Sequence, residues 1–233
     1  MAAAALLAAD PLCRPAALAP GEAPPGELDL APVVEALRGG HDLNDEYERV
    51  FGLMLAKKCP PYETEYCPQT FSVYRSQAMA DIAGFYRAFG VGPSDDLPER
   101  PDHLSLELEF VAFLIAKDRC AADAERREVC RGAQRRFVRE HLCWWAPAFA
   151  RALQSQCDRV LGGPGSRSEF YPALARALAA LVAAERAILG VEAPTDLVAP
   201  APVAPPEEMS CHDCALGEMG AAGVALGTPS PIR

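Results

Sequence analysis

Apolar residues recur at helical spacing through most of the chain. The clearest segment is 69–89, where three- and four-residue steps connect Phe71, Tyr74, Ala78, Ile82, Phe85 and Phe89. This spacing puts all of these side chains on one face of a helix and predicts a buried stripe. The sequence Gly90-Val91-Gly92-Pro93 follows and predicts the end of that helix, because glycine and proline stop helices.

The same periodicity predicts helices over 28–37, 44–57, 121–142, 146–161 and 169–189, the last with an apolar stripe of Leu174, Leu178, Leu181 and Ile188. Another helix is predicted to begin at Asp102, a residue type that accepts hydrogen bonds from free first-turn amides. Its apolar residues from Leu104 to Ile115 occupy more than one face, which is typical of a central helix. No segment alternates like a strand. The predicted fold class is therefore all-α, a single-domain helical bundle.

Low-complexity sequence is expected at both ends of this domain. Residues 1–26 are rich in alanine and proline, and 191–233 contain Pro194, Pro200, Pro202, Pro205, Pro206, Pro229 and Pro231. Prolines at this density prevent a packed helix. We therefore expect a helical domain over 27–190 and a disordered tail after it.

Charge argues against binding to nucleic acid. The net charge is -10, from 22 basic and 32 acidic residues, whereas contact with a phosphate backbone needs a basic surface. From Glu27 to Lys117 there are 16 acidic and 8 basic residues, and from Asp118 to Arg186 there are 8 acidic and 12 basic residues. This distribution predicts an acidic N-terminal part that suits a basic partner.

Cysteine usage and hydropathy indicate a reducing compartment. The number of cysteines, nine, is odd, and residues 1–9 lack the positively charged start of a secretory signal. The other apolar runs are too short or too interrupted to span a bilayer. We expect a cytoplasmic protein without stable membrane insertion, whose thiols are reduced and mostly buried.

Signatures of catalysis are missing from the sequence. It has no GxSxG elbow, Walker A loop, HExxH pair or dinucleotide fingerprint, so we expect no cofactor and no enzymatic activity. Cys211 and Cys214 form a CxxC, but a zinc site needs four ligands and no second CxxC exists. Two incidental thiols in a tail are the favoured interpretation, with a redox pair or half of an intermolecular metal site as the alternative.

Five short segments, taken together and in order, resemble the motifs of a known protein family, although each segment alone is too short to be specific. They are Glu46-Tyr47-Glu48-Arg49-Val50-Phe51, Pro60-Pro61-Tyr62-Glu63-Thr64-Glu65-Tyr66, Phe85-Tyr86-Arg87-Ala88-Phe89-Gly90, Glu99-Arg100-Pro101-Asp102-His103 continuing to Glu107 and Phe110, and His141-Leu142 followed by Trp145 and Phe149. In this order they resemble the EYxxLF, PPYESxY, FYxxFG, ExPDHxxxELxF and HLxxWxxxF segments of the TorD/DmsD/NarJ family of redox-enzyme maturation chaperones. The Ala/Pro-rich start and the CxxC tail depart from the family pattern.

The resemblance implies a function in assembly. A family member binds the twin-arginine leader, or the corresponding N-terminal segment, of a molybdenum-containing oxidoreductase catalytic subunit. It keeps the apoenzyme ready for cofactor insertion and delays export. The resemblance also implies a cytoplasmic, non-catalytic, all-helical protein, which we expect to be a monomer or a homodimer.

A receptor for a twin-arginine leader needs carboxylates beside an apolar groove, because a carboxylate matches the guanidinium fork. The candidate residues in the matching segments are Tyr62, Glu63, Tyr66, Tyr86, Glu99, Asp102, His103, Glu107, His141 and Trp145. Tyr62, Asp102 and His103 are favoured, because loops and helix starts present side chains to ligands. The competing interpretation is structural: a capping aspartate, histidines held by carboxylates, and aromatic residues packed in the core.

Two other functions compete with the chaperone. A helical scaffold or regulatory protein would show a large apolar patch instead of an acid-lined groove. A metal- or redox-linked assembly factor would act through Cys211 and Cys214.

Overall fold

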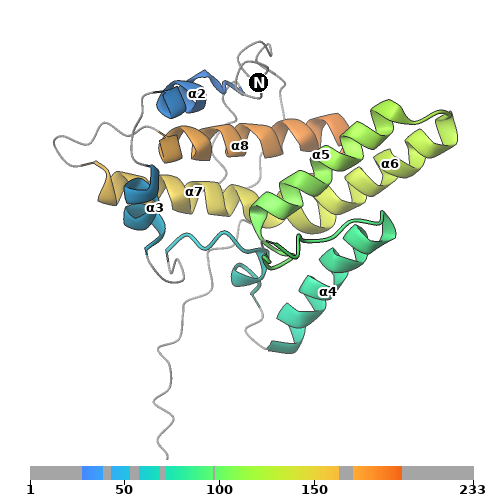
Figure 1. The fold of residues 1–233 in the computed structure, drawn as a ribbon, viewed down its shortest axis with the longest axis horizontal. Coiled ribbons are helices and arrows are strands. Elements are labelled where there is room, and N and C mark those ends of the chain that lie inside the picture. The colour runs from blue at the N-terminus through green and yellow to red at the C-terminus, as the bar shows by residue number, and fades with distance from the viewer. Residues whose placement is uncertain are drawn as a thin grey trace, which may run out of the picture. The chain divides into compact units, whose positions relative to one another are not determined.

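Regular structure in this protein is helical wherever the computed structural model describes it, which is over residues 28–38, 43–52, 58–68, 72–96, 98–162 and 170–195. The helices are α2 (Ala31–Arg38), α3 (Leu43–Phe51), α4 (Ser72–Ala88), α5 (Leu104–Cys120), α6 (Ala124–Phe137), α7 (Cys143–Val160) and α8 (Phe170–Leu189), with a 3-10 turn η1 (Glu63–Glu65) and a π-helical turn η2 (Val138–Leu142) (Figure 1). Among the described residues, an isolated β-bridge pairs Tyr62 with His103. The predicted all-α bundle is confirmed.

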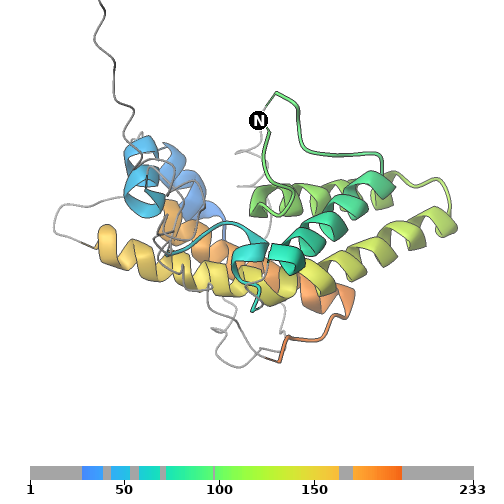
Figure 2. The same ribbon diagram turned by 90° about the horizontal axis from the view of Figure 1, so that it is seen from below.

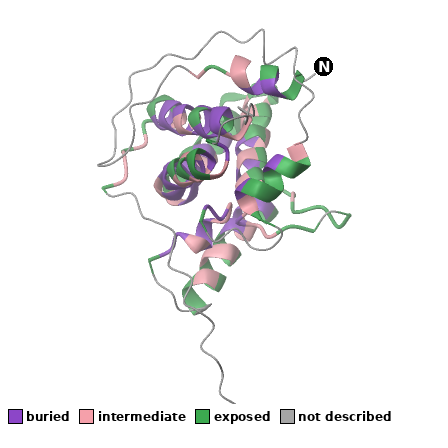
Figure 3. Cartoon of the chain, turned by 90° about the vertical axis from the view of Figure 1, so that its left-hand side faces the viewer, coloured by how far each residue is buried: buried purple, intermediate pink, exposed green. Residues whose placement is uncertain are grey.

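The core forms where α7 and α8 pack along each other and α5 and α6 pack against them (Figures 1 and 2). The buried side of α7 contains Trp145, Phe149 and Leu153, and the buried side of α8 is mostly alanine, which lets helices approach closely. The short helix α2 adds a smaller cluster, in which Val33 packs with Ala173 and Ala177 of α8. In Figure 3 the buried residues lie on the sides where these helices face one another.

Aromatic rings join α4, α5 and α6. The ring of Phe137 lies with its centroid 5.2 Å from that of Phe85 and 4.9 Å from that of Phe110, both in edge-on geometry. Edge-to-face contacts at such distances add to the stabilisation that burial provides. They connect the C-terminal half of α4 to the rest of the bundle.

The stripe predicted for 69–89 is correct only in its second half. Ile82 and Phe85 are buried, but the side chain of Tyr74 is 51% exposed and that of its neighbour Val73 is 71% exposed. The Ser72 end of α4 extends away from the other helices (Figure 1), so the apolar positions there lack a surface to pack against. Phe71 lies outside the described residues.

The stripe predicted for the last helix is also partly wrong. Leu178 is buried, whereas Leu174 and Ile188 are exposed. The alanines of α8 form the packed face instead, because small side chains fit the close contact with α7 and α2.

A break predicted between the helices 121–142 and 146–161 does not exist. The π turn η2 connects α6 directly to α7, with the amide of Cys143 bonded to the carbonyl of Val138. Side chains bond two carbonyls in the turn: Cys143 Sγ donates to Arg139 O, and Trp144 Nε1 donates to Glu140 O. A π turn adds one residue per hydrogen-bonded ring, and so changes which side chains point inward.

None of the described helices combines the length and the apolar character needed to cross a lipid bilayer.

Candidate functional site

Two loops that belong to the motif segments meet directly before α5. The amide of Glu63 donates to the carbonyl of Asp102 at 3.0 Å, and the amide of Leu104 donates to the carbonyl of Pro61 at 2.9 Å. These bonds hold the loop 58–68 against the loop 98–103, directly before α5. We call this contact the loop junction.

Asp102 is the centre of the loop junction and is fully buried. Its carboxylate accepts hydrogen bonds from Thr64 N at 3.2 Å and from Thr64 Oγ1 at 2.7 Å. It also accepts from Arg100 Nε at 3.0 Å and Nη2 at 2.8 Å, which is a bidentate pair. Asp102 therefore joins the two loops.

The predicted capping role of Asp102 is wrong. The residue that caps α5 is His103, whose Nδ1 accepts a hydrogen bond from the amide of Ser105. Asp102 is already engaged by Thr64 and Arg100, one residue further from the helix. Burial lowers the pKa of His103, which favours the neutral ring that this acceptor role requires.

A polar surface covers the outer side of the loop junction. The guanidinium of Arg100 lies over the ring of Tyr62, 4.3 Å from its centroid, and Tyr62 Oη donates to Glu99 at 3.3 Å. The ring of His103 meets the ring of Tyr62 edge-on at 5.1 Å. Burial and the neighbouring Glu99 raise the pKa of Tyr62, so its hydroxyl remains a donor.

A buried layer of carboxyl groups lies beneath this surface. Both oxygens of Glu63 lie 3.1 Å from His141 Nδ1, and Trp145 Nε1 donates to Glu107 Oε2 at 3.2 Å. Burial, followed by the charge of Glu63, raises the pKa of Glu107 well above its ordinary value. Within the described residues Glu107 Oε1 has no hydrogen-bond partner. A neutral Glu107 avoids the cost of an unpaired buried charge.

Two tyrosines complete the interior. Tyr66 is fully buried, with its ring 5.4 Å from that of Trp145. Tyr86 of α4 donates its hydroxyl hydrogen to the carbonyl of Pro101 at 2.8 Å. These tyrosines fix the loop junction to α4 and α7.

All ten predicted site residues therefore lie at the loop junction or directly beneath it. Three of them reach the surface, namely Tyr62, Glu99 and His103. The other seven are at most 3% exposed, namely Glu63, Tyr66, Tyr86, Asp102, Glu107, His141 and Trp145. In this structure the seven hold the loops in place, and only the first three are accessible to a partner.

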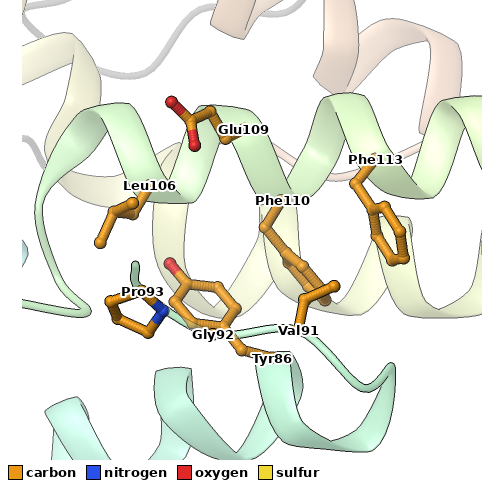
Figure 4. A pocket seen from close by; sticks show the side chains of 8 residues that line it. All are labelled: Tyr86, Val91, Gly92, Pro93, Leu106, Glu109, Phe110 and Phe113. Carbon is orange, nitrogen blue, oxygen red and sulfur yellow. The ribbon is translucent and has the colours of Figure 1, made fainter. Parts of the chain in front are cut away.

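A pocket adjoins the loop junction between α5 and the segment that follows α4 (Figure 4). It has a volume of about 160 Å³ and is lined by Tyr86, Val91, Gly92, Pro93, Leu106, Glu109, Phe110 and Phe113. Its walls are mostly apolar, and Glu109 supplies an exposed carboxylate. Tyr86 lines the pocket and also bonds Pro101, so the pocket lies next to the loop junction.

Several residues of the site were not among the predicted ones. Thr64 and Arg100 lie within the quoted segments, but only the structure shows that both bond Asp102. Leu106, Phe110 and Phe113 fall at four- and three-residue steps on α5, and this helical spacing was the available signal.

The thiols in the described part of the chain are free, and five of the six are buried. Burial raises the pKa of both Cys59 and Cys67 to about 11, which disfavours reactive thiolates. No group of three or more histidine, cysteine, aspartate or glutamate side chains suited to a metal occurs within the described ranges. Cys211 and Cys214 lie outside them.

An all-α bundle in which four of the five motif segments meet at one loop junction, while the fifth packs on α7, defines the class of this protein. The family model for the nitrate reductase delta subunit matches residues 23–151, more than half of the chain. The chain belongs to this family, and the resemblance to TorD-type proteins is confirmed.

Curated relatives have names consistent with this family. The chain is 35% identical over 121 residues to a selenate reductase assembly chaperone protein of Thauera selenatis, covering 52% of this chain and 57% of the relative. It is 35% identical over 82 residues to a chlorate reductase assembly chaperone protein of Ideonella dechloratans, covering 35% and 42%. It is 29% identical over 98 residues to the chaperone protein TorD of Photobacterium profundum, covering 42% and 45%. These alignments span about half the length of the relatives, and no solved structure matches the chain.

Proposed function

We propose that this chain is a cytoplasmic, non-catalytic chaperone for the catalytic subunit of a molybdenum-containing oxidoreductase. It binds the subunit's twin-arginine leader or N-terminal segment, assists cofactor insertion and delays export. The observation that carries the proposal is the carboxylate- and aromatic-lined surface of the loop junction, which lies next to an apolar pocket. The names of the relatives, which include assembly chaperones of selenate and chlorate reductases, support it.

The chemistry of the surface suits a leader that has basic residues followed by an apolar run. Glu99 and Glu109 are exposed carboxylates that attract guanidinium groups, and Tyr62 offers an aromatic face. The pocket beside Phe110 and Phe113 accepts an apolar side chain of the following run. The buried members of the predicted set support this surface by holding the two loops together.

The test is calorimetric titration of the full chain with a synthetic leader from the oxidoreductase encoded beside it. The expected result is saturable binding that weakens about tenfold, or roughly 1.4 kcal/mol, when the arginine pair of the peptide becomes lysine. Tyr62→Ala and Glu99→Gln should weaken binding as well. The matched control is Glu125→Gln, which neutralises an exposed carboxylate on α6, away from the loop junction.

Other outcomes would identify the competing functions. Binding to the mature apo-subunit but not to its leader would move recognition to a segment after the leader. Binding to neither would reject the chaperone and favour a helical scaffold. Stoichiometric metal that disappears when Cys211 and Cys214 are replaced would favour the metal-linked factor.

A further inference from the structure

Arg100 occupies an arginine-recognition site formed by its own chain. Its guanidinium makes two hydrogen bonds to Asp102, at 3.0 and 2.8 Å, and another to Thr64 Oγ1 at 2.7 Å. Glu65 lies 3.6 Å away as a second carboxylate, and the Tyr62 ring covers the guanidinium at 4.3 Å. A planar cation held between a bidentate carboxylate and an aromatic face is the usual arrangement for binding arginine.

Four groups surround the Arg100 guanidinium, and they come from two loops. Arg100 itself belongs to the loop 98–103. Thr64 and Glu65 belong to the loop 58–68, whereas Asp102 lies two residues from Arg100 itself. Asp102 and Thr64 are fully buried, and the two hydrogen bonds from Thr64 to the Asp102 carboxylate do not involve Arg100. The side chain of Arg100 is 36% exposed, so this residue lies at the surface of the site, unlike Asp102.

We propose that these groups form a guanidinium site in which Arg100 is a replaceable internal occupant. An arginine of the bound client segment displaces Arg100 and takes the same contacts with Asp102, Glu65 and Tyr62. This inference rests on the function proposed above and adds the mechanism of recognition. Arg100 thereby keeps the site filled and the buried Asp102 charge paired until a client arrives.

An internal occupant lowers the apparent affinity for the client by the fraction of sites that it fills. Removing Arg100 should therefore tighten client binding, the opposite of what losing a structural ion pair would do. Arg100→Lys provides a milder case, because lysine keeps the charge but cannot make the bidentate contact.

The first experiment is calorimetry of the twin-arginine leader with the wild-type chain, Arg100→Ala and Arg100→Lys. Both variants should bind the leader more tightly, Arg100→Ala by at least about threefold. A leader in which lysines replace the arginine pair should lose this gain. The matched control is Arg75→Ala, since Arg75 also pairs with Glu65, at 3.3 Å, but makes no bond to Asp102. Its affinity should stay within about twofold of wild type.

A second measurement needs no client. Methylguanidinium at about 20 mM should raise the thermal midpoint of Arg100→Ala, because a ligand that binds only the folded state stabilises it. The same concentration should not raise the midpoint of the wild type, whose site is filled. Absence of this rescue, or leader binding that weakens in both Arg100 variants, would overturn the proposal. Rescue without leader binding to any variant would reject the client role and the proposed function, while keeping the guanidinium site.

Discussion

At the scale of single residues, the buried acid Glu107 makes stability depend on pH. Its raised pKa means that the folded protein keeps a proton over a pH range in which the unfolded chain has released it. Stability should therefore fall as pH rises above about 4.5, the ordinary pKa of the group. Urea unfolding of Glu107→Gln over a pH series should show a flatter slope, because the amide stays neutral. Glu109→Gln, on the same helix but exposed, should keep the wild-type slope.

Asp102 provides a second test at this scale. Asp102→Ala leaves the buried amide and hydroxyl of Thr64 without their acceptor and frees the guanidinium of Arg100. The free energy of unfolding should drop by about 2–4 kcal/mol, measured by chemical denaturation. His103→Ala, which removes a partly exposed cap, should cost only about 1 kcal/mol. Equal losses for the two variants would contradict the central place of Asp102 in the loop junction.

Sequence reasoning located these residues but not their burial. Asp102, Glu63, His141 and Trp145 all come from the motif segments, and the structure brings these side chains close together. Hydropathy alone favours exposure for acids and histidines, whereas here contacts between loops distant in sequence bury them. The pairing of Glu63 with His141, 78 positions apart, has no local signal in the chain. The sequence likewise gives no signal that Arg100 pairs with Asp102.

At the scale of elements, the two halves of α4 should differ in their contribution to stability. Phe85 is 8% exposed and contacts the rings of Phe110 and Phe137, so Phe85→Ala should cost about 3–5 kcal/mol. Val73→Ala, at a position 71% exposed, should change stability by less than about 0.5 kcal/mol. Thermal and urea unfolding of both variants would measure this difference. A large loss for Val73→Ala would show that the exposed half of α4 has a packing partner.

Helix positions followed well from periodicity, and helix connections did not. The expected helix 169–189 matches α8 within one residue at its start, because a long apolar period is a strong local signal. The connection at 138–142 was missed, since a π turn arises from packing on both sides and not from a breaker residue. Parts of the apolar stripes on α4 and α8 were predicted to be buried but are exposed. Periodicity identifies one face of a helix, but it does not show whether another element covers that face.

At the scale of the whole molecule, the uneven charge should control how fast a client arrives. Net negative charge from Glu27 to Lys117 attracts a basic leader before any contact forms. Stopped-flow measurements should show an association rate that falls with added salt, while the dissociation rate changes much less. An association rate independent of salt would rule out this steering.

The C-terminal cysteines offer a separate test of the whole chain. Replacing Cys211 and Cys214 with serine should leave leader affinity unchanged within about twofold, because the residues of the loop junction come from 58–68 and 98–103. Metal analysis of the unmodified chain should find less than about 0.1 equivalent of zinc, since a single CxxC supplies two of four ligands. Stoichiometric zinc would instead support the metal-linked alternative.

The π turn also provides the molecule with its own optical reporter. The two tryptophans of the chain are adjacent, and both follow this turn: Trp144 bonds back to Glu140 at 3.2 Å, and Trp145 lies buried against Glu107 and Tyr66. Intrinsic fluorescence therefore comes from one place, directly below the loop junction. Any event that loosens that junction should shift the emission of Trp145 to longer wavelength, so the integrity of the junction can be followed without attaching a dye.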